Sequence, residues 1–75
     1  MPYVNEDLMF RELFSRNVKR YMQLNDMGQK ELAVRSHLSQ SAISKLINGY
    51  ATPTIRSVVN IALAFDIEVD KLIYF

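Results

Sequence analysis

Five polar side chains lie close together in the middle of this chain, and together they could hydrogen-bond to the edges of nucleic-acid bases. Ile43 and Leu46 alternate with them at helical spacing, so the polar groups would share the outer face of one short helix. In a major groove, glutamine pairs with adenine, lysine with guanine, and serine with either. Surface serines that merely cap a helix would give a similar pattern. The five residues are Ser39, Gln40, Ser41, Ser44 and Lys45.

Residues suited to catalysis or metal binding are sparse. The chain has no cysteine and one histidine, His37, so it offers neither thiolate ligands nor a nucleophile–base–acid set. Asp66, Glu68 and Asp70 have the opening spacing of a calcium loop, but Lys71 stands where that loop needs glycine. We therefore predict that the protein is not an enzyme and uses no metal or cofactor.

Length and charge limit the kinds of protein that this chain could be. The chain has 75 residues, 49% of them hydrophobic, which predicts one small domain over 1–75. Its apolar runs are too short to span a membrane and it begins without a signal-peptide pattern, so we expect a cytoplasmic protein. Residues 11–65 carry eight basic and three acidic side chains, a net charge of +5 between acidic ends. A basic middle favours a polyanionic partner.

Apolar residues recur every three or four positions, which predicts an all-α protein with five helices. The first helix is expected over about 6–25, with Asn5 as its N-cap and Val4 packed against Met9. Residues 1–12 would extend this helix beyond the rest of the domain.

Two short helices should follow, over about 29–36 and 40–47. Gly28 is an acceptable N-cap for the first of them, with Glu31 placed to accept from the amide of the cap residue. Ser39 is a strong N-cap for the second, and the Asn-Gly pair after it tolerates the left-handed backbone of a helix end.

A fourth helix should begin after Thr52 or Thr54 and end at Asp66, and a short fifth helix should cover about 69–74. The spacing predicts that one side of the fourth helix is apolar and faces the core. The residues expected on it are Ile55, Val58, Ala62 and Phe65, widened by Ile61.

This arrangement resembles the phage-repressor and Cro-like (Xre-type) helix-turn-helix DNA-binding family over about residues 18–72. The resemblance rests on apolar, small and turn residues at the spacing of the two short helices and of the helices that cover them. They are Val18, Tyr21, Gln29, Leu32, Ala33, Leu38, Ile43, Ser44, Leu46, Asn48, Gly49, Pro53, Thr54, Val58, Ile61, Ala62, Phe65, Val69 and Leu72.

The resemblance implies a five-helix, lambda-repressor-like domain with an extended first helix. It implies that the third helix reads bases in the major groove through Ser39, Gln40, Ser41, Ser44 and Lys45. It also implies that backbone phosphates of double-stranded DNA are bound by Gln29, Asn48, Tyr50 and Thr52.

Three positions depart from the family pattern. His37 stands where the family most often has a glycine with positive φ, which predicts mild strain. Met22 and Ile47 replace a common Arg–Glu ion pair between the first and third helices, which predicts an apolar contact there. Tyr50 stands where a basic residue is frequent, so its hydroxyl would have to serve the phosphate.

Apolar residues near the C-terminus predict a homodimer. Leu63 falls where the family usually has a polar residue, and the chain closes on three apolar or aromatic side chains. The alternative is that these residues fold back onto the first helix. The expected interface is Leu63, Ile73, Tyr74 and Phe75, together with Val59.

The resulting hypothesis is a transcriptional regulator, most simply a repressor, that binds a palindromic operator as a homodimer. Family analogy favours a phage, plasmid or restriction–modification setting in bacteria. The main alternative is an antitoxin-like protein-interaction module that binds DNA only secondarily, and a purely structural helical bundle is a third. Contact with RNA polymerase is left open by the sequence.

Overall fold

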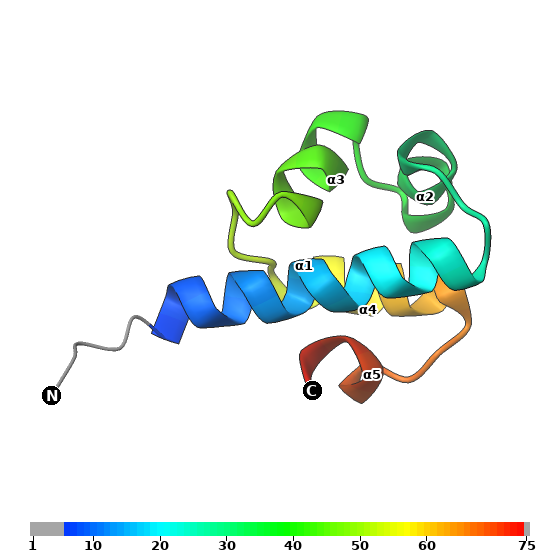
Figure 1. Ribbon diagram of the computed structural model, residues 1–75. Helices are drawn as coiled ribbons and strands as arrows, with labels where there is room; N and C mark the ends of the chain where they lie inside the picture. The colour runs from blue at the N-terminus through cyan, green and yellow to red at the C-terminus, as the bar shows by residue number, and fades with distance from the viewer. Residues whose placement is uncertain (1–5, 75) are drawn as a thin grey trace, which may run out of the picture.

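The computed structural model describes residues 6–74, and this part of the chain is built from five α-helices (Figure 1). The all-α class and the predicted order of helices are confirmed. The expected cap at Asn5, the packing partner Val4 and the interface residue Phe75 lie outside the described residues. The helices are α1 (Glu6–Leu24), α2 (Gln29–Ser36), α3 (Gln40–Ile47), α4 (Ile55–Phe65) and α5 (Asp70–Ile73).

Local hydrogen bonds explain where the helices begin. The Ser39 hydroxyl accepts from the amide of Ala42 at 3.0 Å and starts α3. Thr54, rather than Thr52, starts α4 by accepting from the amide of Ser57 at 3.1 Å. These side chains satisfy amides that a helix leaves without partners in its first turn.

The start of α2 differs from the prediction. Gly28 is the N-cap residue, but no side chain caps this helix. Glu31, expected to reach back to the cap, instead accepts from Arg35 Nε one turn later at 2.9 Å. The ion pair within the helix competes for the same carboxylate, so the first turn of α2 keeps amides that no side chain covers.

His37 ends α2 with φ 60° and ψ 32°, in the left-handed region that the sequence predicted. Its amide donates to the carbonyl of Val34 at 3.3 Å, and the amide of Leu38 donates to that of Ala33 at 3.0 Å. A left-handed residue at this place reverses the chain and lets α3 begin within three residues.

The helices enclose one apolar core. α1 runs across the molecule, with α2 and α3 on one side and α5 on the other, and α4 lies behind it (Figure 1). The side chains of Phe14, Leu32, Ile43, Ile61 and Leu72 are completely buried. The expectation for Ile55 is wrong, because its side chain is 86% exposed. Ile55 is the first residue of α4 and lies beyond the reach of the covering helices.

Two buried polar residues of α1 link the helices in ways that the periodicity did not indicate. The Asn17 side-chain amide donates to the carbonyls of Leu72 at 2.9 Å and Tyr74 at 2.8 Å, and so joins α1 to α5. The Ser15 hydroxyl donates to the carbonyl of Ile47 and joins α1 to the end of α3. No helix within residues 6–74 is long and apolar enough to cross a membrane.

Candidate nucleic-acid interface

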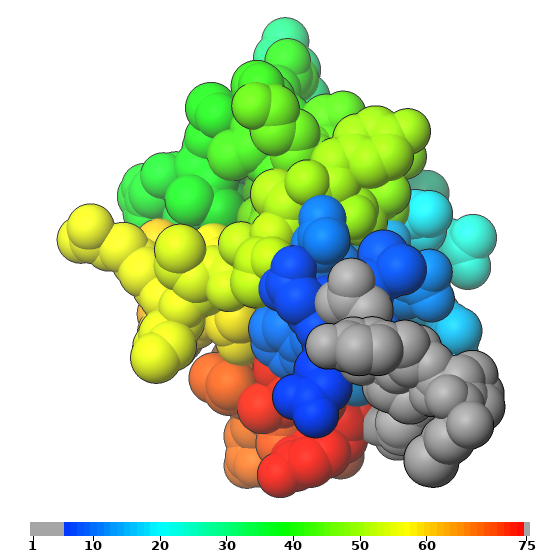
Figure 2. Space-filling view, turned by 90° about the vertical axis from the view of Figure 1, so that its left-hand side faces the viewer, coloured from blue at the N-terminus to red at the C-terminus, as the bar shows by residue number. Residues whose placement is uncertain are grey.

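The outer face of α3 carries the polar side chains that the sequence singled out. Gln40, Ser41 and Lys45 are exposed, and Ser44 is half-buried. Ser39 is also exposed, but its hydroxyl oxygen already accepts the capping hydrogen bond. Figure 2 shows the segment around α3, in green, at the surface with nothing described lying over it in this view.

The opposite face of α3 holds the helix in place. Ile43 is completely buried, and Leu46 and Ile47 are 5% and 6% exposed. Because the apolar side chains face α1 and α2, the glutamine, serine and lysine side chains must point away from the domain. A helix held in this way presents its polar face as a rigid unit.

Candidate phosphate-binding residues lie at the start of α2 and in the loop after α3. Gln29 is exposed and is the first residue of α2, beside the amides that no side chain caps. The partial positive charge at such a helix end favours an anion. In the loop, Tyr50 is 76% exposed and Gly49 has φ 72°, a turn geometry suited to glycine.

Two loop side chains are already engaged within the protein. Asn48 Nδ2 donates to the carbonyl of Ser44 at 2.8 Å, so this amide closes α3. The Thr52 hydroxyl donates to Asp7 Oδ1 of α1 at 2.6 Å. A phosphate oxygen only accepts, so Thr52 would have to redirect its single hydroxyl hydrogen to hold a phosphate, whereas Asn48 could use the second hydrogen of its amide.

A basic surface on α1, which the residue-by-residue prediction missed, borders the same loop. Arg16, Lys19 and Arg20 line a shallow hollow of about 560 Å³ together with Asn48, Gly49 and one acidic residue, Glu12. Among the described residues, no carboxylate lies within ion-pair distance of these three cations. The net charge of +5 over residues 11–65 was the signal that pointed to them.

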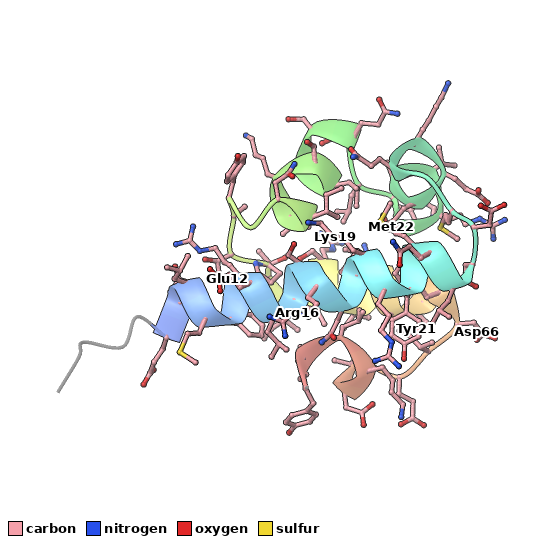
Figure 3. The ribbon with its side chains drawn as sticks, in the orientation of Figure 1. Glu12, Arg16, Lys19, Tyr21, Met22 and Asp66 are labelled. Atoms are coloured by element: carbon pink, nitrogen blue, oxygen red, sulfur yellow. The ribbon has the colours of Figure 1, made fainter. Side chains whose placement is uncertain are left out.

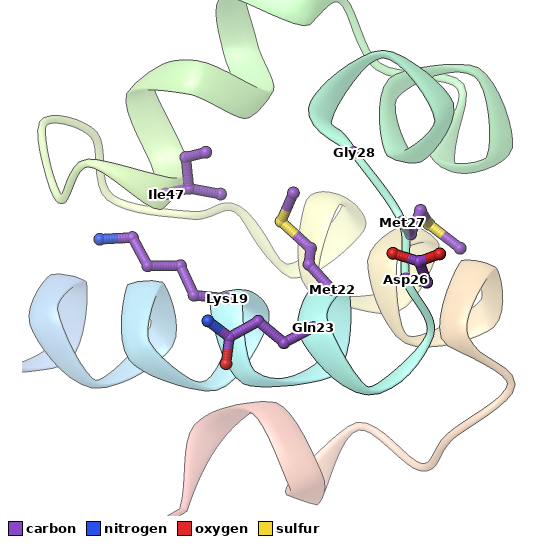
Figure 4. Close-up of a pocket in the computed structure, with 7 residues that line it drawn as sticks. All are labelled: Lys19, Met22, Gln23, Asp26, Met27, Gly28 and Ile47. Carbon is purple, nitrogen blue, oxygen red and sulfur yellow. The ribbon is translucent and has the colours of Figure 1, made fainter.

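Met22 and Ile47 line one hollow between α1 and α3, where an ion pair is frequent in the family the sequence resembles. Figure 4 shows both side chains facing this space, which has a volume of about 400 Å³, and the Lys19 amine beside it. Lys19 and Met22 lie on the side of α1 that faces α3, and Tyr21 lies on the side of α5 (Figure 3).

The residues expected at a dimer interface differ in their exposure. Leu63 is 72% exposed and Tyr74 is 67% exposed, whereas Ile73 is half-buried against the core. Val59 lines a narrow apolar hollow of about 190 Å³ that the sequence did not indicate. Its other lining residues are Phe10, Pro53, Ile55, Val58, Val69 and Ile73.

Between residues 6 and 74, no three His, Cys, Asp or Glu side chains are grouped to hold an ion. The chemistry that the described surface offers is hydrogen bonding from α3, cationic groups on α1 and apolar contact on α4.

Comparison with known proteins identifies the family. The helix-turn-helix family profile matches residues 18–72. An uncharacterised HTH-type transcriptional regulator, y4dL, of Sinorhizobium fredii is 34% identical over 58 residues, which are 77% of this chain and 30% of the relative. The chain thus spans less than a third of that relative's length.

A solved structure has the same fold. The restriction-modification controller protein C.AhdI from Aeromonas hydrophila superposes with a TM-score of 0.80 at 22% identity, over 83% of this chain and 94% of the controller. The chain therefore belongs to the helix-turn-helix family, of the phage-repressor and Cro-like (Xre) type.

Proposed function

We propose that this protein is a sequence-specific DNA-binding transcriptional regulator that inserts α3 into the major groove. The observation that carries the proposal is the exposed polar face of α3 backed by completely buried Ile43. Gln40, Ser41, Ser44 and Lys45 would read base edges, with Gln40 and Lys45 making the bidentate contacts. Ser39 would contribute mainly by fixing the start of the helix.

Phosphate contacts would supply most of the affinity. Gln29 at the start of α2 and the loop residues Asn48, Tyr50 and Thr52 would bind the backbone on the two sides of α3. The hollow of α1 supports this assignment, because it opens beside Asn48 and its three cations outnumber its one carboxylate, Glu12, with which they form no ion pair. Binding should therefore weaken steeply as salt is added.

The operator would be palindromic and the protein a homodimer. Leu63, Ile73, Tyr74 and Phe75 would form the interface, with Val59 at its edge, and exposure of Leu63 and Tyr74 supports this. Two copies would place their α3 helices in successive major grooves about 34 Å apart. Repression would follow from blocking polymerase access, and the names of the two similar proteins support a regulatory role.

Selection of bound duplexes from a random pool at near-physiological salt tests the proposal. We expect an inverted repeat with half-sites about one helical turn apart. The double variant Gln40→Ala/Lys45→Ala should lose the sequence preference, since each bidentate contact is worth about 1–3 kcal/mol. Lys71→Ala on α5 removes a charge on the far side of α1 from α3 and serves as the control (Figure 1).

A protein-interaction module is the second candidate, because Ile55 and Leu63 leave an apolar surface that a partner could cover. Failure to enrich any sequence, with the protein folded, would favour this candidate over the regulator. Unchanged sequence preference in the double variant would mean that α3 does not read the bases.

A further inference from the structure

The N-terminal part of α1 is bound to the loop that follows α3. Asp7 Oδ1 accepts from the Thr52 hydroxyl at 2.6 Å, and Asp7 Oδ2 pairs with Arg11 Nη2 at 3.1 Å. Arg11 Nη1 in turn donates to the carbonyl of Tyr50 at 3.5 Å. One ion pair on α1 therefore holds both a side chain and a main-chain carbonyl of this loop.

A third contact continues the same row. The Ser15 hydroxyl donates to the carbonyl of Ile47, the last residue of α3. Asp7, Arg11 and Ser15 are spaced four residues apart, so they form one stripe along α1. We call these three residues the α1 ladder; from its N-terminal end it contacts Thr52, Tyr50 and Ile47.

The α1 ladder is not part of the matched family region. All three residues precede position 18, where the helix-turn-helix match begins. The loop they hold carries Tyr50 and Thr52, two of the residues assigned to backbone phosphates. An added stretch of helix is therefore connected to one part of the candidate DNA interface.

We propose that the α1 ladder positions the loop for the DNA backbone, and that Arg11 shields the phosphates from the charge of Asp7. This inference rests on the proposed DNA-binding function. Asp7 brings a carboxylate into hydrogen-bond contact with Thr52. A phosphate bound by this loop would lie closer to that carboxylate than the Debye length of about 8–10 Å, so salt would not fully screen the repulsion between the two negative charges. Arg11 supplies the compensating charge.

The partial burial of Arg11 strengthens this compensation. The Arg11 side chain is 24% exposed, and its Nε atom is buried with no hydrogen-bond partner among the described residues. Asp7 is 53% exposed in the same pair. Since water screens a partly covered guanidinium less than a fully exposed one, the charge of Arg11 acts more strongly on the nearby carboxylate and loop.

The order of affinities in three variants tests this mechanism. Binding to a mixed-sequence duplex of about 20 base pairs is measured by fluorescence anisotropy at about 0.1 M salt, because phosphate contacts need no operator. Arg11→Ala should bind about tenfold more weakly than the wild type, since it leaves the Asp7 carboxylate uncompensated. Asp7→Asn should bind at least as tightly as the wild type, because asparagine still accepts from Thr52 but carries no charge.

The double variant Asp7→Asn/Arg11→Ala should bind more tightly than Arg11→Ala alone. If the α1 ladder served only the stability of the loop, each substitution would weaken DNA binding further. Tighter binding by the double variant than by Arg11→Ala therefore distinguishes charge compensation from a purely stabilising role. Lys71→Ala, with the same loss of one positive charge on α5, should change binding less than about twofold. Equal binding by Arg11→Ala and Lys71→Ala, or weakening by Asp7→Asn as large as by Arg11→Ala, would overturn the proposal.

A measurement without DNA keeps the inference separate from the proposed function. Hydrogen exchange of the Gly49 and Tyr50 amides, which donate to the carbonyls of Leu46 at 3.2 Å and Lys45 at 2.9 Å, should be faster in Arg11→Ala and unchanged in Asp7→Asn and Lys71→Ala when followed by NMR. If the wild type binds no duplex, the regulator proposal fails and the DNA part of this inference fails with it. If the loop amides are unchanged in Arg11→Ala, the positioning role is wrong whatever the protein binds.

Discussion

Asn17 is the residue whose replacement best tests how the helices are joined. Its side chain is 6% exposed and its amide donates to two carbonyls of the C-terminal segment, Leu72 at 2.9 Å and Tyr74 at 2.8 Å. Asn17→Ala removes both donors. Because α5 has only four residues, it cannot be stable apart from such contacts, and we expect it to detach first.

The expected cost follows from these contacts. Each hydrogen bond contributes about 1 kcal/mol net, and an acceptor left buried without a partner adds about 1–3 kcal/mol. The Leu72 hydrogen bond is buried, whereas the one to Tyr74 is part-buried and its carbonyl can turn to water. We therefore expect Asn17→Ala to lower the free energy of unfolding by about 2–3 kcal/mol. A chain of 75 residues has a total of roughly 4–11 kcal/mol.

Urea unfolding followed by circular dichroism measures this loss, and Asn25→Ala is the matched control. Asn25 Nδ2 also donates to a main-chain carbonyl, that of Tyr21 at 2.7 Å, but this hydrogen bond is exposed. Removal of this exposed hydrogen bond should lower the free energy of unfolding by less than about 0.5 kcal/mol. Equal losses in the two variants would refute the reasoning, because burial would then have no effect.

Asn17→Asp adds a pH test. An ionised carboxylate can only accept, so it would face two carbonyl oxygens, whereas the protonated form can still donate to one of them. The pKa of the introduced group should therefore be higher in the folded than in the unfolded state. With that sign, stability is greatest below the unfolded pKa of about 3.9 and falls as the pH rises through the folded pKa. A variant equally stable at about pH 4 and pH 7 would contradict this account.

Three further outcomes are expected. His37→Gly should raise the free energy of unfolding by about 0.5–1 kcal/mol, because glycine adopts φ 60° without strain; a loss in urea unfolding would mean that the histidine side chain contributes stabilising contacts. Leu63→Glu should leave the thermal midpoint nearly unchanged but shift sedimentation at tens of micromolar from dimer to monomer, and a wild type that is itself monomeric would remove the dimer proposal. Met22→Arg/Ile47→Glu should lower stability by about 1–2 kcal/mol, since two charges lose water beside α3; a more stable variant in urea unfolding would show that the hollow is polar enough for an ion pair.

The starts of α3 and α4 could be predicted from the sequence because capping acts over three residues. Ser39 and Thr54 each accept from an amide three positions ahead, and short polar residues in front of an apolar run indicate this directly. The left-handed turn at His37 was expected from the family resemblance, because the family most often has a glycine with positive φ at this position. The candidate base-reading face also depends only on helical spacing within eight residues, although its contact with DNA stays a prediction.

Contacts between residues far apart in the chain were harder to predict from the sequence. Asn17 and Ser15 look like ordinary polar positions of an amphipathic helix, yet both are buried against segments more than thirty residues away. Ile55 satisfies the apolar periodicity of α4 and is nevertheless exposed. Periodicity gives the direction in which a side chain points, but not whether another helix extends far enough to cover it.

The sequence by itself determined five helices, their approximate ends and an outer polar face on the third, because caps, turns and amphipathic spacing are local interactions. Tertiary structure alone decided that Asp7 and Arg11 contact a loop some forty residues later, and that three cationic side chains of α1 line a hollow beside Asn48. These relations depend on how α1 packs across α3, and packing is set by the shape of the whole core. The α1 ladder could therefore be recognised only once the helices were in place.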